Sequence, residues 1–409
     1  MRVIGIIAEF NPFHEGHEYL IKEAKKLVAD PRAVVMTVMS GPFVQRGLPS
    51  VAPKHIRAKM ALNSGVDVAI ELPFTFACAP SERFAKGAVE LLYRTGVVTD
   101  LAFGVDCQDP SLLLTLAELE PDDDVIKASL QEGKSYPAAR ADGLVSKWLQ
   151  ENPGADNTDA VREALRMPNS SLALDYIKAV KDLKTGFKIH MIPRIPGHSA
   201  TSTREKLFSS DTSSISSVAN SLIGTIPDKA LAVWLSALSC GNTSIPNRDR
   251  YIRTLISMTE REDDLTDYAY MTDGLDGYIK NNFENVRGNY SFNSVTAKLA
   301  TKHFTMPRIQ RALASLIVGQ KAEYVDTEKH VQYIRVLGFS REGRYCLKVM
   351  SKCSRLPIIH NCSDALELYS EKPRLKTQFE LDLRANSIQA EYLGMNPNYE
   401  WSVPPVVVK

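Results

Sequence analysis

Two histidines near the start of the chain have a spacing that suits phosphate chemistry. His14 and His17 flank Glu15 and Gly16, and Asn11-Pro12-Phe13 comes directly before them. Each imidazole can donate a hydrogen bond to a phosphate oxygen, and it can carry a positive charge where its surroundings raise its pKa. Gly16 lets the backbone come close to a bulky anion. We therefore expect His14 and His17 to stabilise the charge that builds up when pyrophosphate leaves a nucleotide.

The two histidines fall where a strand is expected to turn into a helix. The apolar run 3–8 predicts a buried strand, and Asn11-Pro12 ends it because proline cannot donate to a ladder. Apolar residues then recur at helical spacing from Tyr19 to Val28. Unpaired N–H groups at such a helix start bind anions in open α/β sheets. A solvated turn is one alternative; a zinc site is another, but no cysteine or third histidine lies nearby.

A group of small hydroxyl residues precedes another expected helix. Residues 199–203 lie between a strand expected at 188–192 and a helix that begins near Glu205. Such a helix start can cradle a phosphate. Arg204 lies in its first turn, where a lone cation is unfavourable unless an anion is bound. We therefore expect Arg204 to stabilise the same developing charge.

Further candidates lie at the carboxyl ends of expected strands, where open α/β sheets bind ligands. Four of them follow the strand expected at 33–39, namely Ser40, Gly41, Gln45 and Arg46. Gln45 and Arg46 either contact phosphate or a substrate carboxylate or are solvated. Gly104 either lets an adenine or ribose pack on bare backbone or serves as a turn glycine. Asn169 either caps a helix or hydrogen-bonds a nucleotide.

Strands and helices alternate over the first hundred residues, which predicts a parallel sheet with right-handed crossovers. The expected strands are 3–8, 33–39, 66–72, 101–105 and 188–192, and the expected helices include 53–63 and 81–92. On helix 53–63, the charged Lys54, Arg57 and Lys59 are expected to face the solvent. Ser81 is expected to cap helix 81–92.

The second half of the chain is expected to be mainly helical, with one small β element. Tyr333–Ser340 and Tyr345–Met350 predict a β-hairpin, and residues 379–392 predict a strand followed by a helix. Residues 298–355 hold twelve Lys or Arg against four Asp or Glu. This concentration of positive charge predicts either a polyanion-binding surface or solvated helix faces.

The chain of 409 residues is long enough for two or three domains, and its net charge of +1 predicts no partner. We expect an α/β fold, with a Rossmann-like parallel-sheet domain at 1–208 and a mainly helical, partly basic region at 209–409. Six scattered cysteines without C-x-x-C pairs argue against a disulfide framework and suit a reducing cytoplasm. Neither a membrane span nor a signal peptide is expected. No metal held by side chains and no protein partner is implied.

Several motifs resemble the tRNA(Met) cytidine acetate ligase family, a branch of the H-x-G-H nucleotidyltransferases. The N-terminal motifs are Glu9-x-Asn11-Pro12-Phe13-His14-x-Gly16-His17, Met39-Ser40-Gly41-x-Phe43-x-Gln45-Arg46-Gly47-x-Pro49, Lys59-Met60-Ala61-Leu62-x-x-Gly65-Val66-Asp67 and Glu71-Leu72-Pro73. Pro168-Asn169 to Tyr176 and Ser199-Ala200-Thr201-Ser202-x-Arg204 extend the resemblance, and a C-terminal basic helix keeps Arg308 and Arg311.

This resemblance implies a two-step reaction. Acetate and ATP, with Mg²⁺ bound to the ATP, would give acetyl-adenylate and pyrophosphate. The exocyclic amine of the wobble cytidine of elongator tRNA(Met) would then attack, giving N4-acetylcytidine and AMP. It assigns catalysis to His14, His17 and Arg204, and contacts with the other substrates or the tRNA to Ser40, Gly41, Gln45, Arg46, Arg308 and Arg311.

The resemblance also carries nucleotide-binding positions over to this chain. They are Ile7, Ala8, Glu9, Phe10, Asn11, Pro12, Phe13, His14, Glu15, Gly16, His17, Glu18, Tyr19, Leu20, Gly104, Asn169 and Arg194. Ser202, in the group of hydroxyl residues before the second helix start, is expected to bind the nucleotide as well. Two other functions stay open. One is a nucleotidyltransferase that adenylates a small phosphate- or carboxylate-bearing metabolite without RNA, and the other is a non-catalytic nucleotide- or RNA-binding protein.

Overall fold

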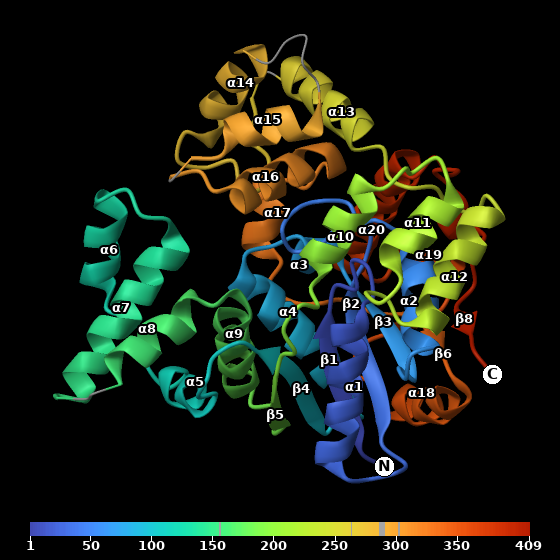
Figure 1. Ribbon diagram of the computed structural model, residues 1–409, viewed down its shortest axis with the longest axis horizontal. Coiled ribbons are helices and arrows are strands. Elements are labelled where there is room, and N and C mark those ends of the chain that lie inside the picture. The colour runs from blue at the N-terminus through green and yellow to red at the C-terminus, as the bar shows by residue number, and fades with distance from the viewer. Residues whose placement is uncertain (155–156, 263, 286–290, 302) are drawn as a thin grey trace.

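A mixed β-sheet runs through the body of the protein, with helices on both of its faces (Figure 1). The computed structural model describes residues 1–154, 157–262, 264–285, 291–301 and 303–409. Lys302, one of the basic residues counted above, lies outside the described residues. Within these ranges, no helix has both the length and the apolar character needed to cross a membrane.

Five parallel strands form the first part of the sheet, in the order β5-β4-β1-β2-β3. They are β1 (Val3–Ala8), β2 (Val34–Ser40), β3 (Val68–Leu72), β4 (Asp100–Val105) and β5 (Lys188–Pro193). The chain moves from β1 through β2 to β3 on one side, and then continues with β4 on the other side of β1. The predicted α/β fold with a parallel sheet is confirmed.

The second half of the chain extends the same sheet. Its strands are β6 (Ile334–Phe339), β7 (Ile358–Ile359) and β8 (Val406–Val407). β6 runs antiparallel to β3, with Phe339 opposite Val68, and β7 and β8 both pair in parallel with β6. The division into domains at residue 208 stays a prediction, and strands from both sides of it share one sheet.

Most of the remaining described chain is helical. The helices of the first half are α1 (Glu15–Val28), α2 (Lys54–Leu62), α3 (Phe74–Ala77), α4 (Ser81–Arg94), α5 (Ser111–Leu116), α6 (Asp123–Gln131), α7 (Tyr136–Glu151), α8 (Thr158–Arg166), α9 (Pro168–Asp182) and α10 (Ala200–Ser209). Those of the second half are α11 (Ile215–Leu222), α12 (Asp228–Ser239), α13 (Arg248–Arg261), α14 (Leu275–Asn285), α15 (Phe292–Leu299), α16 (Met306–Val318), α17 (Ala322–Thr327), α18 (Arg341–Cys353), α19 (Cys362–Glu367) and α20 (Pro373–Tyr392). A single 3₁₀ turn, η1 (Tyr399–Trp401), follows them.

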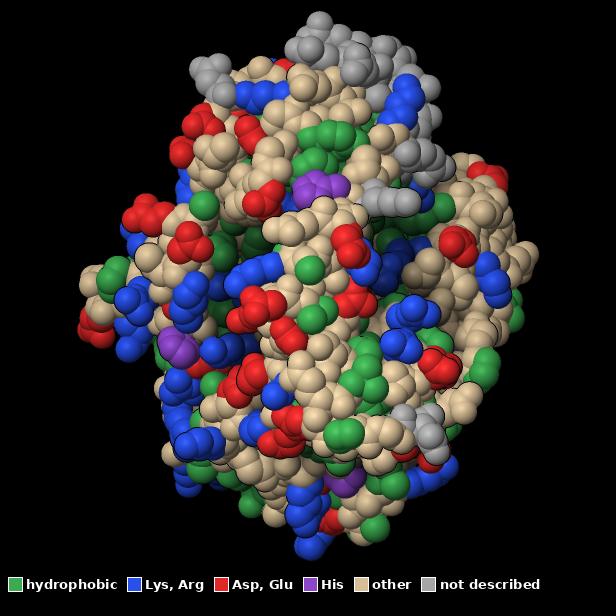
Figure 2. All heavy atoms as spheres, turned by 90° about the vertical axis from the view of Figure 1, so that its left-hand side faces the viewer, with side chains coloured by type: hydrophobic (Ala, Val, Ile, Leu, Met, Phe, Trp, Pro, Cys, Tyr) green, Lys and Arg blue, Asp and Glu red, His purple; other side chains and the backbone are tan. Residues whose placement is uncertain are grey.

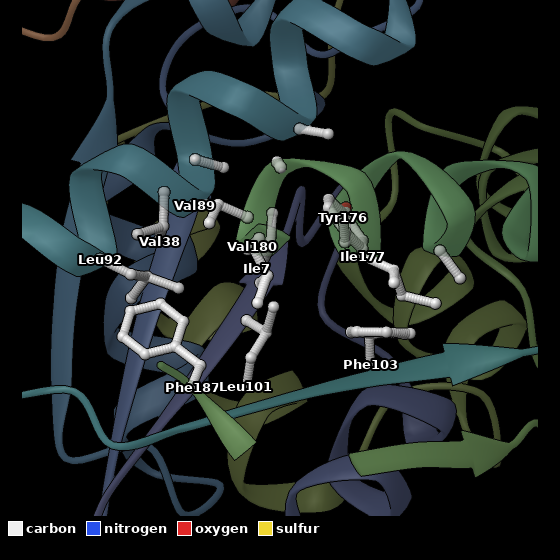
Figure 3. Close-up of a cluster of buried hydrophobic side chains, with 14 of the residues drawn as sticks. Ile7, Val38, Val89, Leu92, Leu101, Phe103, Tyr176, Ile177, Val180 and Phe187 are labelled. Atoms are coloured by element: carbon white, nitrogen blue, oxygen red, sulfur yellow. The ribbon is translucent and has the colours of Figure 1, made fainter. Parts of the chain in front are cut away.

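Successive side chains of a strand point to opposite faces, and this divides the apolar residues of the sheet between two cores. Ile7 faces the core under α4, α9 and α18, whereas Ile6 faces the core under α1, α2 and α12. Figure 3 shows part of the first core, where Ile7 and Leu101 of the sheet lie near Val180 of α9 and Leu92 of α4. The two cores hold the sheet rigidly between its helical layers.

A third core joins the C-terminal helices to the loop that follows β2. Phe43 of this loop and Phe74 of α3 belong to a cluster formed with α13 to α16 and α20. The two rings meet edge to face, with centroids 5.4 Å apart. Asp382 of α20 accepts a hydrogen bond of 2.7 Å from the backbone N–H of Phe74. The second half therefore supports the carboxyl end of β2 directly.

Two strands predicted in the second half are wrong. Residues 345–350 lie in α18, whose start is capped by Ser340 accepting a hydrogen bond from the Gly343 N–H at 3.1 Å. Residues 379–392 are helical throughout, as part of α20. Phe379 and Leu381 of this helix are buried in different cores. A helix that is buried on two sides can thus show the alternation of apolar and polar residues that is typical of a strand.

The cap predicted at Ser81 is also wrong, and of the two alternatives for Asn169 the structure excludes the cap. The residues at the cap positions of α4 and α9 are Pro80 and Met167. Ser81 is the first residue of α4, and Asn169 is the second residue of α9. The Asn169 side chain is therefore available for another role.

The prediction that Lys54 faces the solvent is wrong, whereas Lys59 on the same helix is exposed. Lys54 Nζ lies 2.8 Å from an oxygen of Glu71 and 2.8 Å from an oxygen of Glu400. Arg335 Nη2 lies 3.1 Å from Glu400. All four side chains are buried. Such charges are tolerated inside a protein only where opposite charges neutralise them.

Removal of the Lys54 charge tests this cluster. We expect Lys54→Met to lower the free energy of unfolding by about 3–5 kcal/mol, because it leaves buried carboxylates without their nearest cation. Lys59→Met, on the exposed face of α2, should change it by less than about 0.5 kcal/mol. Urea unfolding at neutral pH measures both. A loss below about 1 kcal/mol for Lys54→Met would show that the cluster does not depend on this cation.

Candidate active site

The candidate site lies at the carboxyl ends of β1 and β4, the two strands between which the sheet order changes direction. Open α/β sheets bind their ligands at such a switch point. The helices α1 and α10 both begin there, and Figure 1 shows α10 above the ends of β1 and β2. Two helix starts therefore approach the same edge of the sheet, as the sequence predicts.

His14 and His17 cap the first turn of α1 with their own ring nitrogens. His14 Nδ1 accepts a hydrogen bond from the Gly16 N–H, and His17 Nδ1 accepts one from the His14 N–H, each at 3.1 Å. The two rings stack with their centroids 3.7 Å apart. A neutral imidazole that accepts at Nδ1 carries its proton on Nε2. Both rings therefore keep an Nε2–H donor that no hydrogen bond within the described residues uses.

The surroundings lower the pKa of both rings rather than raising it. Burial lowers the pKa of His14 to about 3, and the charge of Arg194 acts in the same direction. Burial also lowers the pKa of His17 well below its usual value, with contributions from His14 and Arg194. At neutral pH both rings are consequently neutral hydrogen-bond donors. The sequence analysis considered a positive charge on these imidazoles, and their surroundings disfavour that charge.

A floor of buried residues supports these rings. Phe10 and Phe13 are almost completely buried, and their ring centroids lie 4.9 and 5.4 Å from that of His17. Asn11 Oδ1 accepts a hydrogen bond from the Val51 N–H at 2.8 Å. The remaining nucleotide-binding candidates of this stretch lie in β1, in the turn and in α1. Ile7 and Ala8 belong to β1, and Pro12 is buried in the turn. The part-exposed candidates in α1 are Glu15, Gly16, Glu18, Tyr19 and Leu20.

Arg204 connects α10 to the turn before α1. Its Nη1 donates to the backbone carbonyl of Asn11 at 2.7 Å. Ser199 caps α10 by accepting a hydrogen bond from the Ser202 N–H at 3.1 Å. Burial lowers the pKa of Arg204, and the nearby carboxylate of Glu9 opposes that shift. The structure thus brings Arg204 to the turn that precedes the two histidines. The contact of Arg204 and Ser202 with a nucleotide stays a prediction.

A carboxylate that the sequence analysis missed joins two candidate residues that lie far apart in the sequence. Asp106 Oδ2 accepts a hydrogen bond from the Asn169 side chain at 2.6 Å, and Asp106 Oδ1 accepts one from Arg194 Nη1 at 3.1 Å. A Cβ added to Gly104 would lie 3.0 Å from Arg194 Cγ. Glycine at this position therefore lets the Arg194 side chain lie flat against β4.

A second missed residue, Arg57, holds the loops around the site. The prediction that it faces the solvent is wrong, because its side chain is completely buried. Its guanidinium donates to the backbone carbonyls of Glu9 at 2.7 Å, Ser40 at 3.0 Å and Ala52 at 2.9 Å, and also to that of Gly41. One side chain thus joins the ends of β1 and β2 to the start of α2.

The loop after β2 is fixed from both ends. Glu9 Oε1 accepts a hydrogen bond from the Gln45 N–H at 2.8 Å. A Cβ on Gly41 would lie only 2.2 Å from an oxygen of Glu71, so this position requires glycine. The loop residues Ser40 and Gly41 are buried, while Gln45 and Arg46 are more accessible. These contacts fix the loop beside the end of β1, and the contact of Ser40, Gly41, Gln45 and Arg46 with a substrate stays a prediction.

The two arginines of the C-terminal motif have different partners. Arg311 of α16 is largely buried, and its Nη1 donates to the Gln45 carbonyl at 3.5 Å. Arg308 forms an ion pair of 2.6 Å with Asp273. Arg311 is thus a support of the site loop, and Arg308 is bound to a neighbouring turn. Their contact with RNA stays a prediction.

Few features of the sequence mark the residues that the sequence analysis missed. Asp106 follows β4 directly, so its position at a strand end was a usable signal. Arg57 lies among charged residues of an apparently amphipathic helix, and nothing in its pattern marks it as buried. His198 lies against Gly16 and has a buried Nδ1 without a partner in the described part of the chain. Across those same residues, no group of three or more His, Cys, Asp or Glu could hold a metal ion.

Comparison with known proteins agrees with this geometry. Residues 1–401 match the family model described as HIGH Nucleotidyl Transferase. A tRNA(Met) cytidine acetate ligase of Thermosipho melanesiensis is 34% identical over 89% of this chain and 85% of its own, and one of Clostridium perfringens is 30% identical over 100% of both. The crystal structure of Thermotoga maritima TmcAL bound with alpha-thio ATP is 27% identical, covers 100% of both chains and superposes with a TM-score of 0.88. The chain therefore belongs to the HIGH nucleotidyl transferase family and, within it, to the tRNA(Met) cytidine acetate ligases.

Proposed function

We propose that this protein activates acetate with ATP and transfers the acetyl group to N4 of the wobble cytidine of elongator tRNA(Met). The observation that carries the proposal is the pair of helix starts, α1 and α10, joined by the hydrogen bond from Arg204 to the Asn11 carbonyl. Two such starts, with two neutral Nε2–H donors and two arginines, suit the phosphates of a nucleotide. The names of the similar ligases and the ATP analogue in the related structure support this choice.

In the first step, a carboxylate oxygen of acetate attacks the α-phosphorus of ATP, and the bond to the β-phosphate breaks. Pyrophosphate leaves with the electron pair of that bond, and its growing charge is what the site must stabilise. His14 and His17 donate from Nε2, while Arg204 and Arg194 supply positive charge. ATP would enter together with Mg²⁺, which would neutralise part of the phosphate charge. Gly104, Asn169 and Ser202 border the nucleotide.

In the second step, the N4 amine of the cytidine attacks the acetyl carbonyl carbon and AMP leaves. The amine loses one proton, and the amide bond of N4-acetylcytidine replaces the mixed anhydride. No protein nucleophile takes part, so catalysis consists of positioning and charge stabilisation. Ser40, Gly41, Gln45 and Arg46 are placed to meet acetate or the cytidine. In this proposal, residues 1–208 catalyse the adenylation, and residues 209–409 contribute the RNA contacts. Because the substrate is a tRNA, we expect the reaction to take place in the cytoplasm.

The proposal is tested by incubating elongator tRNA(Met) with the protein, ATP and acetate, followed by nucleoside analysis of the tRNA. We expect N4-acetylcytidine only when all three are present. Acetate-dependent exchange of pyrophosphate into ATP should accompany it. Exchange that depends on another acid and not on acetate, or a tRNA that stays unmodified while exchange proceeds, would contradict the proposal.

The donor role of His14 can be separated from its capping role. Asparagine is a strong N-cap residue, so His14→Asn keeps an acceptor for the Gly16 N–H but removes the Nε2–H donor. We expect the free energy of unfolding to change by less than about 1 kcal/mol. Pyrophosphate exchange should fall by about 10²–10³-fold, as when one oxyanion donor is lost. A stable variant with wild-type exchange would show that His14 only caps the helix.

Asp106 is expected to act by positioning Asn169 and Arg194. We expect Asp106→Ala to raise the KM for ATP by about tenfold or more and to lower kcat less, because the nucleotide contacts lose their support while the histidine donors stay in place. Asp109→Ala, an exposed carboxylate on the same loop, serves as the matched control and should leave both parameters unchanged. Initial rates of acetate-dependent exchange measure this. Equal effects of the two substitutions would rule out the positioning role.

A further inference from the structure

The structure divides the basic region of the sequence into two classes of cation. Several of its members are engaged inside the protein: Arg335 is buried against Glu400, Arg311 is largely buried, and Arg308 is paired with Asp273. The other members that the structure describes are exposed: Lys298, Lys321 and Lys329 lie apart from one another along the chain, whereas Arg341, Arg344, Lys348 and Lys352 lie on one helix, α18, and Arg355 comes directly after it.

The four cations inside α18, Arg341, Arg344, Lys348 and Lys352, form one stripe. At 100° per residue, their positions fall within an arc of about 80° around the helix axis, which is less than the width of a single helix face. Tyr345, whose side chain is 63% exposed, lies on the same face. Arg355 follows the end of the helix, and its guanidinium lies over the Tyr93 ring. The opposite face packs on the sheet through Cys346 and Met350. The basic stripe therefore points away from the protein.

No acid is paired with the stripe in the described structure, although Glu342 is exposed in the first turn of the same helix. None of its four cations forms an ion pair or a side-chain hydrogen bond within the described ranges, and Arg344 lies 5.9 Å from the centroid of the Phe339 ring. Like charges four residues apart, such as Arg344 and Lys348, repel each other, and Arg341 in the first turn of the helix opposes its dipole. Figure 2 shows a contrasting face, over α6 to α8, where basic and acidic side chains are mixed. An external anion would relieve the repulsion on α18.

The position of α18 indicates which part of an RNA it would meet. β6 runs antiparallel to β3, so α18 follows the edge of the sheet opposite to the site, and Figure 1 shows it near the N-terminus. Strands of five to seven residues separate the two edges, a span of about 20 Å. An anticodon loop in the site cannot cover this span, whereas the helical arms of a folded tRNA extend farther.

We propose that the exposed face of α18 binds the phosphate backbone of the tRNA outside the anticodon stem-loop. Arginine and lysine neutralise phosphates without reading the sequence, and each contact releases counterions. Tyr345 adds a surface for a ribose or a base edge. This surface would let the enzyme prefer a complete tRNA over an isolated hairpin with the same anticodon. The inference rests on the proposed function, since it takes tRNA as the substrate.

The test compares two variants that each lose three positive charges. One is the triple substitution Arg344→Gln, Lys348→Gln and Lys352→Gln on α18. The matched control is Lys127→Gln, Lys147→Gln and Arg162→Gln on α6, α7 and α8. Affinity is measured for elongator tRNA(Met) and for its isolated anticodon stem-loop over a range of salt concentrations, and unfolding midpoints check that both variants are folded.

We expect the α18 variant to bind the complete tRNA about tenfold or more weakly than the wild type, with a salt slope smaller by about 2–3. Its affinity for the stem-loop and its pyrophosphate exchange should stay unchanged, and the control variant should behave as the wild type. Equal losses in the two variants, or an equal loss for tRNA and stem-loop, would overturn the assignment. A wild-type protein that binds tRNA but never acetylates it would instead contradict the proposed function and leave this surface standing.

Discussion

The first turn of α1 is the constraint on which the candidate site depends. Its backbone N–H groups at Gly16 and His14 are satisfied by the ring nitrogens of His14 and His17 and by no other side chain in the described structure. Because each Nδ1 is occupied in this way, each ring must place its proton on Nε2. The same hydrogen bonds that begin the helix thus decide the direction in which the imidazoles can donate. Burial then keeps the rings neutral.

The surrounding fold holds this turn through side chains that cross long stretches of sequence. Arg57 collects carbonyls from the ends of β1 and β2, and Arg204 reaches the Asn11 carbonyl from α10. The C-terminal helix α20 contributes as well, since Gln389 donates to the Ser50 carbonyl at 2.9 Å. The site therefore cannot be understood as a property of the first half alone. In this protein the second half completes the sheet of the first half and braces the loop after β2.

The sequence predicts well those features that depend on local pattern. The strand–turn–helix at the start, the second helix start near Arg204 and the parallel sheet follow from periodicity and from breaks in it. It predicts poorly what depends on tertiary surroundings. Arg57 and Lys54 have the pattern of solvated residues, and only the surrounding carbonyls and carboxylates explain their burial. The sequence of α20 alternates like that of a strand because its apolar residues are buried in two different cores. The predicted second strand of the hairpin is a helix instead, because Ser340 caps the start of α18.

The net charge of a sequence region likewise does not show whether its basic residues support the fold or bind a ligand. The basic residues of the second half are divided by the fold between internal support, as with Arg311, and a free stripe on α18. Sequence can count such cations but cannot assign them, because the assignment depends on which carboxylates and carbonyls the tertiary structure brings near. The same holds for Asp106, whose partners Asn169 and Arg194 lie far along the chain.

The central claim is that His14 and His17 are neutral donors whose orientation is fixed by the caps of α1. It is tested most directly by nitrogen-15 NMR of the imidazoles in the protein without nucleotide, titrated with acid. The account predicts a proton on Nε2 of both rings at neutral pH, a pKa of about 3 for His14, and a pKa for His17 well below the usual value. A pKa near that of a free histidine for either ring, or a proton on Nδ1, would contradict it.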